Sequence, residues 1–360
     1  MLNWTWTTQV FFTLHTLVFL MKMHSYAFYN GHLSTTEHRL SALDTPENAS
    51  TAAAVRYPSS SANLDDVDSA ADKKKHDDET EALTQLREDL AVELTSPLGR
   101  VTYPQNLTAW NYADYVMCPT LCYELEYPRT EKTQYLELFY KTLAIFGCIF
   151  LLTITSEDFI VPVLSDSAQR LAGVTSRSDQ GLILAETISM LLFPFMITML
   201  LVFLVIFEYV LGAFAEITCF ADRHFYSDWW NSCDWLEFSR EWNIPVHHFL
   251  RRHVYGAARP NMSRNTATFV TFLISSVGHE LVMGCITKKL RGYGFLAQMS
   301  QLPIVAIQRS KFVKGRKLFN VSPFRLAVCG SMIRLIMCSE CDVLDVHDPW
   351  TLCRKYTAFV

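Results

Sequence analysis

The sequence predicts an all-α protein, a polytopic bundle of helices that cross a membrane. Half of the 360 residues are hydrophobic and only 19% are charged, and the apolar residues are gathered into long runs. A run of about 18 or more apolar residues is long enough to cross the hydrocarbon layer as a helix. Four runs are nearly free of charge and predict three or four such spans: 1–21, 138–156, 187–207 and 265–286.

The first run is interpreted as a retained helix rather than a signal peptide. It has no basic region at its start and no small-residue cleavage site at its end. Aromatic residues that could anchor a span at the membrane–water interface lie near its ends: Trp4, Trp6, Tyr26 and Tyr29. We therefore predict that residues 1–34 form an N-terminal transmembrane helix with its flank.

Residues 35–105 have a different composition, dominated by Ser, Thr, Ala, Asp and Lys. Such a segment buries too little apolar surface to offset its ordering entropy. It is predicted to be a disordered polar insertion, followed by the main helical region, 106–345, and a polar tail, 346–360. Leucines at helical spacing predict one short amphipathic helix inside the insertion, and we prefer a solvated helix there to a docked one: Leu83, Leu86, Leu90 and Leu94.

The ten cysteines are scattered, and several lie in or beside apolar runs, where small apolar packing is their expected role. The tail has one Cys-x-x-Cys pair, Cys338 and Cys341, with His347 and Cys353 nearby, and these residue types ligate zinc. Because there is no second pair, the spacing does not predict a zinc site. No metal is expected.

The stretch "FYSDWWN", residues 225–231, places four aromatic rings, an acid and an amide together soon after the third apolar run. One interpretation is an interfacial belt, because Trp and Tyr have an apolar part and a hydrogen-bonding end. The nearby segment 240–255, "REWNIPVHHFLRRHVY", adds Trp242, Asn243, three histidines and three arginines. Arginine binds phosphate and rings cover apolar groups, so the two segments favour a ligand that is part phosphate and part fatty chain.

Nucleic acid is the competing partner for a basic, aromatic segment. The net charge of −5 and the predicted spans argue against it.

The segment 265–287 is predicted to be the catalytic helix. Its polar residues recur at three- and four-residue steps and so share one helix face: Thr268, Thr271, Ser275 and His279. A polar stripe that faced lipid would be costly, so it is expected to line an internal cavity. The alternative is that the hydroxyls bond carbonyls four residues earlier and that His279 is a neutral structural histidine. The ligand-binding character of the preceding segment favours catalysis.

Three motifs, "FYSDWWN", "EWNIPVH" and "SSVGHEL", closely resemble the membrane-bound O-acyltransferase family. Within it they resemble the branch of the acyl-CoA:sterol and diacylglycerol acyltransferases, and residues 21–34 and 124–130 are similar to the fungal sterol enzymes. The likeness runs from residue 1 to about 325 and is interrupted by the polar insertion. Relatives carry further helices before Met1 and a hydrophobic helix after Phe324, so the chain resembles a member without N-terminal helices and with a divergent C-terminus.

The resemblance implies a multi-helix membrane bundle around a reaction chamber, which acyl-CoA enters from the cytosol and a lipid alcohol from the side. By matching position, it implies that His279 is the catalytic histidine and Asn243 the second catalytic residue. It also implies that acyl-CoA is bound by Phe225, Tyr226, Asp228, Trp229, Trp230, Asn231, Ser275 and Gln298.

The implied activity is that of an acyl-CoA:sterol O-acyltransferase, a multi-pass homo-oligomer (dimer or tetramer) of the endoplasmic reticulum membrane. Its partners would be acyl-CoA, a sterol and the lipid bilayer, with acyl-CoA as co-substrate and no other cofactor. A neutral His279 would accept the sterol hydroxyl proton, and the Asn243 amide would stabilise the oxyanion or orient the substrates. Two alternatives are a diacylglycerol acyltransferase and a truncated, inactive relative that binds acyl-CoA or sterol.

Overall fold

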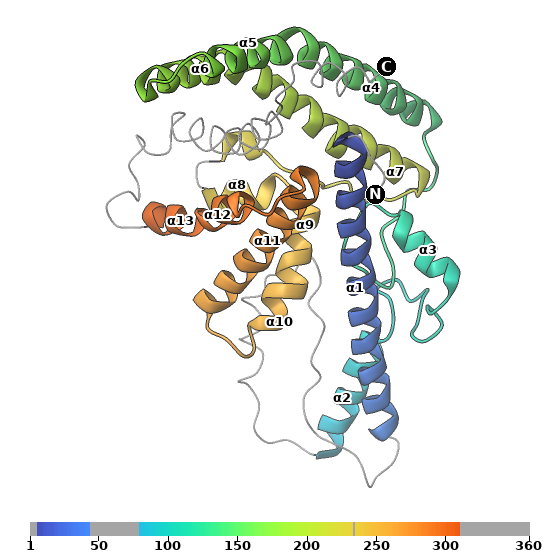
Figure 1. Cartoon of the computed structure of the whole chain (residues 1–360). Coiled ribbons are helices and arrows are strands. Elements are labelled where there is room, and N and C mark those ends of the chain that lie inside the picture. The colour runs from blue at the N-terminus through green and yellow to red at the C-terminus, as the bar shows by residue number, and fades with distance from the viewer. Residues whose placement is uncertain (1–5, 44–78, 233–234, 310–360) are drawn as a thin grey trace.

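The computed structural model describes residues 6–43, 79–232 and 235–309 (Figure 1). The polar tail, its cysteines and the middle of the polar insertion lie outside these residues. Within the described ranges the chain is helical and forms no sheet. The prediction of an all-α fold is confirmed.

The N-terminal helix α1 (Trp6–Leu43) is one continuous rod (Figure 1). It runs past residue 34, so the boundary predicted there lies inside a helix. Among the described residues three helices are long and apolar enough to cross a membrane, and α1 is not one of them. That residues 1–34 cross a membrane stays a prediction.

The helix α2 (Glu79–Glu93) packs against α1 (Figure 1). Leu90 is only 2% exposed, and Leu94, just after the helix, packs with Leu33 of α1 and with Leu125. The prediction of a solvated helix is wrong, because the leucine stripe finds an apolar partner on α1. Disorder is likewise wrong for the parts of the insertion that the structure describes, 35–43 and 79–105.

Two long helices, each containing a π-helical segment, lie side by side across the top of the molecule (Figure 1). The first consists of α4 (Tyr135–Ile154), η2 (Thr155–Ile160) and α5 (Val161–Ala172). The second consists of α6 (Arg177–Phe203), η3 (Leu204–Val210) and α7 (Leu211–Ile217). They are two of the three candidate spans, and the third belongs to α11 (Arg264–Thr287), which matches the predicted 265–287. The chain is a multi-pass membrane protein.

Shorter helices connect these spans. The helix α3 (Ala109–Met117) precedes α4. Between α7 and α11 the chain forms η4 (Trp229–Asn231), α8 (Trp235–Glu241), α9 (Ile244–Phe249), η5 (Leu250–Tyr255) and α10 (Gly256–Ala258). After α11 come α12 (Tyr293–Met299) and α13 (Gln301–Arg309).

An aromatic core cluster joins α3, the loop that follows it, η3 and the start of the 225–231 motif. It consists of Tyr115, Cys118, Tyr123, Tyr127, Phe203, Phe207, Ala215, Phe220 and Phe225. Because Phe225 belongs to this cluster, the motif is fixed by the same core that holds α3 against the long helices.

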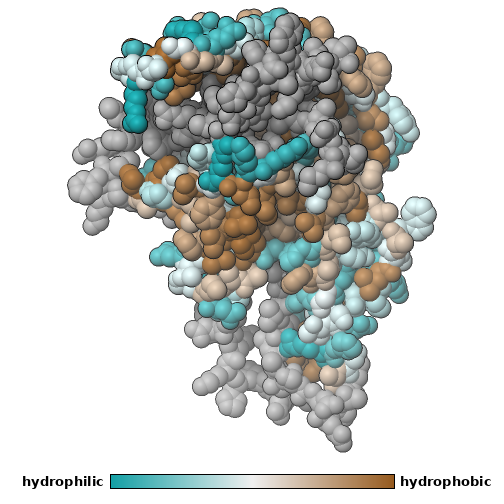
Figure 2. Space-filling view, viewed as in Figure 1, coloured by the Kyte–Doolittle hydropathy of each residue, from teal (hydrophilic) through white to brown (hydrophobic). Residues whose placement is uncertain are grey.

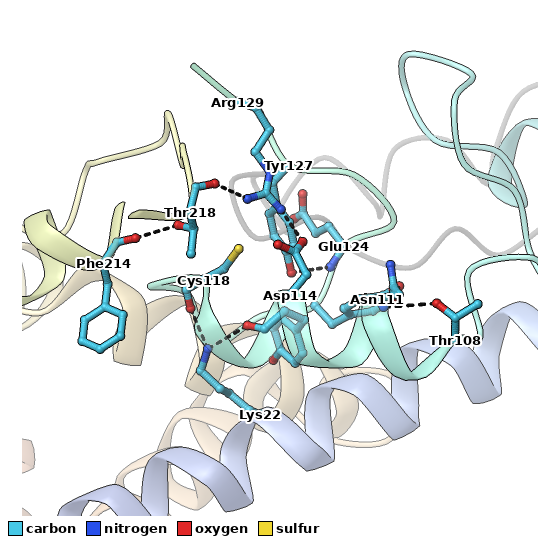
Figure 3. Close-up of polar contacts among 12 residues, drawn as sticks. Lys22, Thr108, Asn111, Asp114, Cys118, Glu124, Tyr127, Arg129, Phe214 and Thr218 are labelled. Atoms are coloured by element: carbon cyan, nitrogen blue, oxygen red, sulfur yellow. Dashed lines mark hydrogen bonds and ion pairs between the residues drawn. The ribbon is translucent and has the colours of Figure 1, made fainter. Parts of the chain in front are cut away.

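Lys22 of α1 closes the C-terminal end of α3 (Figure 3). Its Nζ donates to the carbonyls of Tyr115 and Val116 at 3.0 Å and to that of Cys118 at 2.6 Å. The last carbonyls of a helix lack partners within the helix, and they attract a cation. The ammonium group of Lys22 is thereby buried and paired.

Arg129 links the same loop to the long helices (Figure 3). It pairs with Asp114 of α3 and donates to the carbonyl of Thr218, just after α7. The loop therefore connects α3 with α7.

A buried polar network surrounds Asn106, which begins an Asn-Leu-Thr sequon. Its Nδ2 donates to Asn30 Oδ1 of α1 at 2.7 Å and to the Tyr123 hydroxyl at 3.1 Å. That hydroxyl in turn donates to Asn111 Oδ1 of α3 at 2.7 Å. Asn106 is only 2% exposed, so its amide is part of the contact between α1 and the loop.

Candidate active site on α11 and the 225–231 motif

His279 lies in the middle of α11, and a backbone carbonyl sets the orientation of its ring. Its Nδ1 is 2.8 Å from the carbonyl oxygen of Ser275, one turn earlier. A carbonyl only accepts, so Nδ1 carries the proton and the lone pair of the neutral ring is on Nε2. This is the tautomer that a general base needs if it is to accept a proton at Nε2.

Gln298 of α12 reaches the same turn of α11. The Gln298 Nε2 donates to the hydroxyl of Ser275 at 3.3 Å. The Gln298 Oε1 accepts a hydrogen bond from Gln301 Nε2 at 2.7 Å. The structure thus brings together three of the predicted site residues: His279, Ser275 and Gln298.

The other two hydroxyl groups of the stripe bond the backbone of their own helix. The hydroxyls of Thr268 and Thr271 donate to the carbonyls of Arg264 and Ala267, at 2.9 and 2.8 Å. For these two residues the back-bonding alternative is correct.

The chamber expected around His279 is not formed by the described residues. His279 is exposed, and apolar side chains of the same helix are exposed as well, among them Phe269, Val277 and Leu281. Figure 2 shows hydrophobic side chains across the middle of this face of the molecule. A chamber needs helices on every side, and the described helices leave part of α11 uncovered.

The 225–231 motif is a compact turn with an inner and an outer side. Phe225 is buried in the aromatic core, the Tyr226 hydroxyl donates to Glu208 of η3 at 3.0 Å, and the Trp229 ring lies 5.2 Å from that of Phe203.

On the outer side, Asp228, Trp230 and Asn231 are exposed. The family resemblance assigns all of these residues to acyl-CoA binding. In the fold, the rings of Phe225, Tyr226 and Trp229 anchor the turn, while the other three side chains are exposed.

Asn243 caps the start of α9. Its Oδ1 accepts the backbone N–H of Val246 at 3.3 Å, so the amide nitrogen Nδ2 is turned away from the helix. Among the described residues no hydrogen bond joins Asn243 to His279.

Two basic residues of the 240–255 segment are buried and bind other parts of the protein. Arg252 is 5% exposed, donates to the Tyr123 carbonyl at 3.2 Å and lies 3.5 Å from Glu124. His253 bonds the hydroxyl of Ser25 at 2.8 Å, and burial lowers its pKa to about 3. The prediction that this segment's arginines bind phosphate is therefore wrong for Arg252, because its guanidinium is committed to the loop before α4.

An ion-pair network that the sequence analysis did not predict supports the motif. Lys141 of α4 lies 3.3 Å from Glu137 and 3.6 Å from Glu208, the acceptor of the Tyr226 hydroxyl. The signal in the sequence is a single lysine inside an apolar run, since a charge within a span needs a partner.

No group of three or more His, Cys, Asp or Glu residues able to hold a metal ion occurs among the residues that the structure describes.

Comparison with known proteins identifies a family model that matches the chain and several proteins of similar sequence. The family model of the membrane-bound O-acyltransferase family matches residues 2–341. "Probable sterol O-acyltransferase 2" of Schizosaccharomyces pombe is 43% identical, with 91% of this chain and 63% of that protein covered. "Sterol O-acyltransferase 2" of Saccharomyces cerevisiae is 38% identical, with 93% and 50% covered.

A "Diacylglycerol O-acyltransferase 1" of Dictyostelium discoideum is 32% identical over 72% of this chain and 42% of its own length. The chain spans 63% of the length of the S. pombe relative and 50% of that of the S. cerevisiae relative. Because the family model covers nearly the whole sequence, the chain belongs to the membrane-bound O-acyltransferase family.

Proposed function

We propose that the chain is an acyl-CoA:sterol O-acyltransferase, with His279 as the general base. It would transfer a fatty acyl group from acyl-CoA to the 3-hydroxyl of a sterol and release a steryl ester and free CoA. Family membership and relatives named as sterol O-acyltransferases over about nine-tenths of the chain support this. The observation that carries the mechanism is the bond between His279 Nδ1 and the Ser275 carbonyl, which leaves Nε2 as the proton acceptor.

In the proposed reaction Nε2 of His279 takes the proton of the sterol hydroxyl as its oxygen attacks the thioester carbonyl carbon. The tetrahedral intermediate collapses, the carbon–sulfur bond breaks, and the CoA thiolate receives the proton from the imidazolium. General-base assistance of this kind contributes about 10²- to 10⁴-fold. The thioester is already activated, so the reaction requires no covalent enzyme intermediate and no cofactor beyond acyl-CoA.

Asn243 is proposed to donate to the oxyanion. Its Oδ1 accepts the N–H of Val246, so its two amide protons point away from α9 and can donate. A fixed amide of this kind stabilises the charge that develops on the carbonyl oxygen.

The outward side chains of the motif, Asp228, Trp230 and Asn231, are proposed to contact acyl-CoA. Phe225, Tyr226 and Trp229 would hold them in place from the core. The proposal further includes the endoplasmic reticulum membrane as the location and a homodimer or homotetramer as the assembly.

The test is ester formation from labelled oleoyl-CoA and a sterol in microsomes that contain the chain. His279→Ala should abolish the product. His15→Ala is the matched control, because His15 is also helical and exposed, and its Nδ1 bonds the Phe11 carbonyl one turn earlier at 2.9 Å. Full turnover by His279→Ala would remove this residue from the mechanism.

Diacylglycerol is the second candidate acceptor, favoured by the Dictyostelium relative. Competition between sterol and diacylglycerol in one assay separates the two. Saturable acyl-CoA binding without any ester would instead identify the chain as a binding protein.

A further inference from the structure

Glu280 directly follows His279 on α11, but its carboxylate binds the start of the next helix, α12. Oε1 accepts the backbone N–H groups of Arg291 at 3.0 Å and Gly292 at 2.6 Å, and Oε2 accepts that of Phe295 at 3.1 Å. The first N–H groups of a helix have no partners within the helix. One carboxylate from α11 therefore binds Phe295 in the first turn of α12 and the two residues just before the helix, Arg291 and Gly292, in hydrogen bonds strengthened by its charge.

Two glycines allow this close approach. Gly292, at the start of α12, has φ +78°, a left-handed conformation that favours glycine. A Cβ on Gly294 would lie 3.2 Å from Glu280 Oε2 and 3.2 Å from the carbonyl oxygen of His279. The first turn of α12 is thus seated against the backbone of His279 itself.

From that seat α12 reaches the turn that orients the imidazole. Gln298 donates to the Ser275 hydroxyl at 3.3 Å, and the Ser275 carbonyl accepts from His279 Nδ1 at 2.8 Å. The contacts form one continuous path from Glu280 through α12 and Gln298 to Ser275 and the His279 ring.

We propose that Glu280 is a positioning residue for acyl transfer. By capping α12 it holds Gln298 on Ser275 and so fixes the carbonyl that orients the ring of His279. The inference rests on the proposed function and adds to it a residue that touches neither substrate. Its physical basis is that a shift of about 1 Å in a reacting group can cost about 100-fold in rate.

Glu280→Gln is the primary variant, because it keeps an acceptor oxygen and loses the charge. In microsomes containing the full chain, we expect kcat per folded molecule to fall about 10-fold or more, with KM for oleoyl-CoA and sterol nearly unchanged. Glu157→Gln is the control, an exposed carboxylate on η2 in another candidate membrane span, and it should keep the wild-type kcat.

The path through α12 is tested by a double-mutant cycle with Gln298→Ala. If Glu280 acts through Gln298, the double variant should be little slower than the slower single variant. Independent, multiplicative losses would overturn the proposal. Gly294→Ala approaches the same contact from α12, where its Cβ crowds Glu280 and the His279 carbonyl, and it should also lower kcat.

A readout without turnover separates this inference from the proposed function. Carbethoxylation of His279 by diethyl pyrocarbonate, followed by mass spectrometry, reports the state of its ring. Glu280→Gln should change the rate of carbethoxylation at His279 and leave the rate at His15 unchanged. An unchanged rate of carbethoxylation at His279 would show that Glu280 only stabilises the contact between α11 and α12. A lower amount of folded protein with wild-type kcat would show the same. Full activity of His279→Ala would instead remove His279 as the general base, and the absence of any ester from the wild-type chain would refute the proposed function.

Discussion

The hydroxyl of Tyr226 donates to the carboxylate of Glu208 across 3.0 Å, joining the 225–231 turn to the π-helical segment η3. Glu208 also lies 3.6 Å from Lys141 of α4, which pairs with Glu137. The turn that is proposed to bind acyl-CoA is thereby tied to two candidate membrane spans.

Tyr226→Phe should loosen this turn. The ring stays packed while the hydrogen bond is lost, so we expect about 1 kcal/mol less stability and a higher KM for oleoyl-CoA, with kcat little changed. Tyr140→Phe is the control, because Tyr140 is exposed on α4. Thermal unfolding in detergent and initial-rate kinetics measure both effects, and an unchanged KM would show that the hydroxyl does not order the turn.

Asn243→Asp separates the two tasks given to Asn243. Aspartate caps a helix as well as asparagine does, so α9 and the unfolding temperature should be retained. The amide donor is lost and a negative charge replaces it, so kcat should fall about 100-fold or more. Asn261→Asp, at an exposed position before α11, should have no effect. Wild-type kcat in Asn243→Asp would exclude this amide as the oxyanion donor.

Acid should destabilise the core around His253. Burial and the neighbouring Arg252 and His24 lower its pKa to about 3, while the unfolded chain has a pKa of about 6.5. The unfolded state therefore binds the proton first. The stabilising contribution of neutral His253 is complete above pH 6.5 and is lost as pH falls from 6.5 toward 3, by up to about 1.4 kcal/mol per pH unit.

His253→Gln should flatten the acid limb of unfolding temperature against pH. His38→Gln, at an exposed position on α1, should leave that limb unchanged. Burial also lowers the pKa of His247, to about 4. His247 should therefore still destabilise the His253→Gln variant in acid, so part of the dependence of its unfolding temperature on pH should remain. A slope identical to wild type would show that His253 titrates normally in the fold.

Lys22→Met should destabilise the contact between α1 and α3. The methionine fills a similar volume, but three carbonyls at the end of α3 lose their donor, at a cost of about 2–3 kcal/mol. Lys132→Met, at an exposed loop position, is the control. A thermal unfolding temperature equal to that of wild type in Lys22→Met would mean that water replaces the ammonium group.

The helical class and the position of α11 follow from the sequence, because uncharged runs and three-to-four spacing indicate local geometry directly. The placement of Ser275 and His279 on one face is of this kind, since residues four apart lie one turn apart on a helix. The docking of α2 does not follow from the sequence, because amphipathicity shows that a face is apolar but does not show which partner covers it.

The roles of individual polar residues were harder to predict. Arg252 and His253 look like ligand-binding groups in the sequence, yet η5 directs both toward α1 and the loop before α4. In the sequence Glu280 is only a charge inside an apolar run. Its partners are backbone N–H groups, which leave no trace in a side-chain pattern.

Because Asn106 is buried, glycosylation of its sequon would reveal whether the chain has folded. An amide that carries a sugar could not remain enclosed between Asn30 and Tyr123. Glycan attachment at this position and the docking of α1 onto the loop exclude each other. A chain found with a sugar there is a chain that was modified before these parts came together, and its electrophoretic shift would count the molecules that failed to assemble.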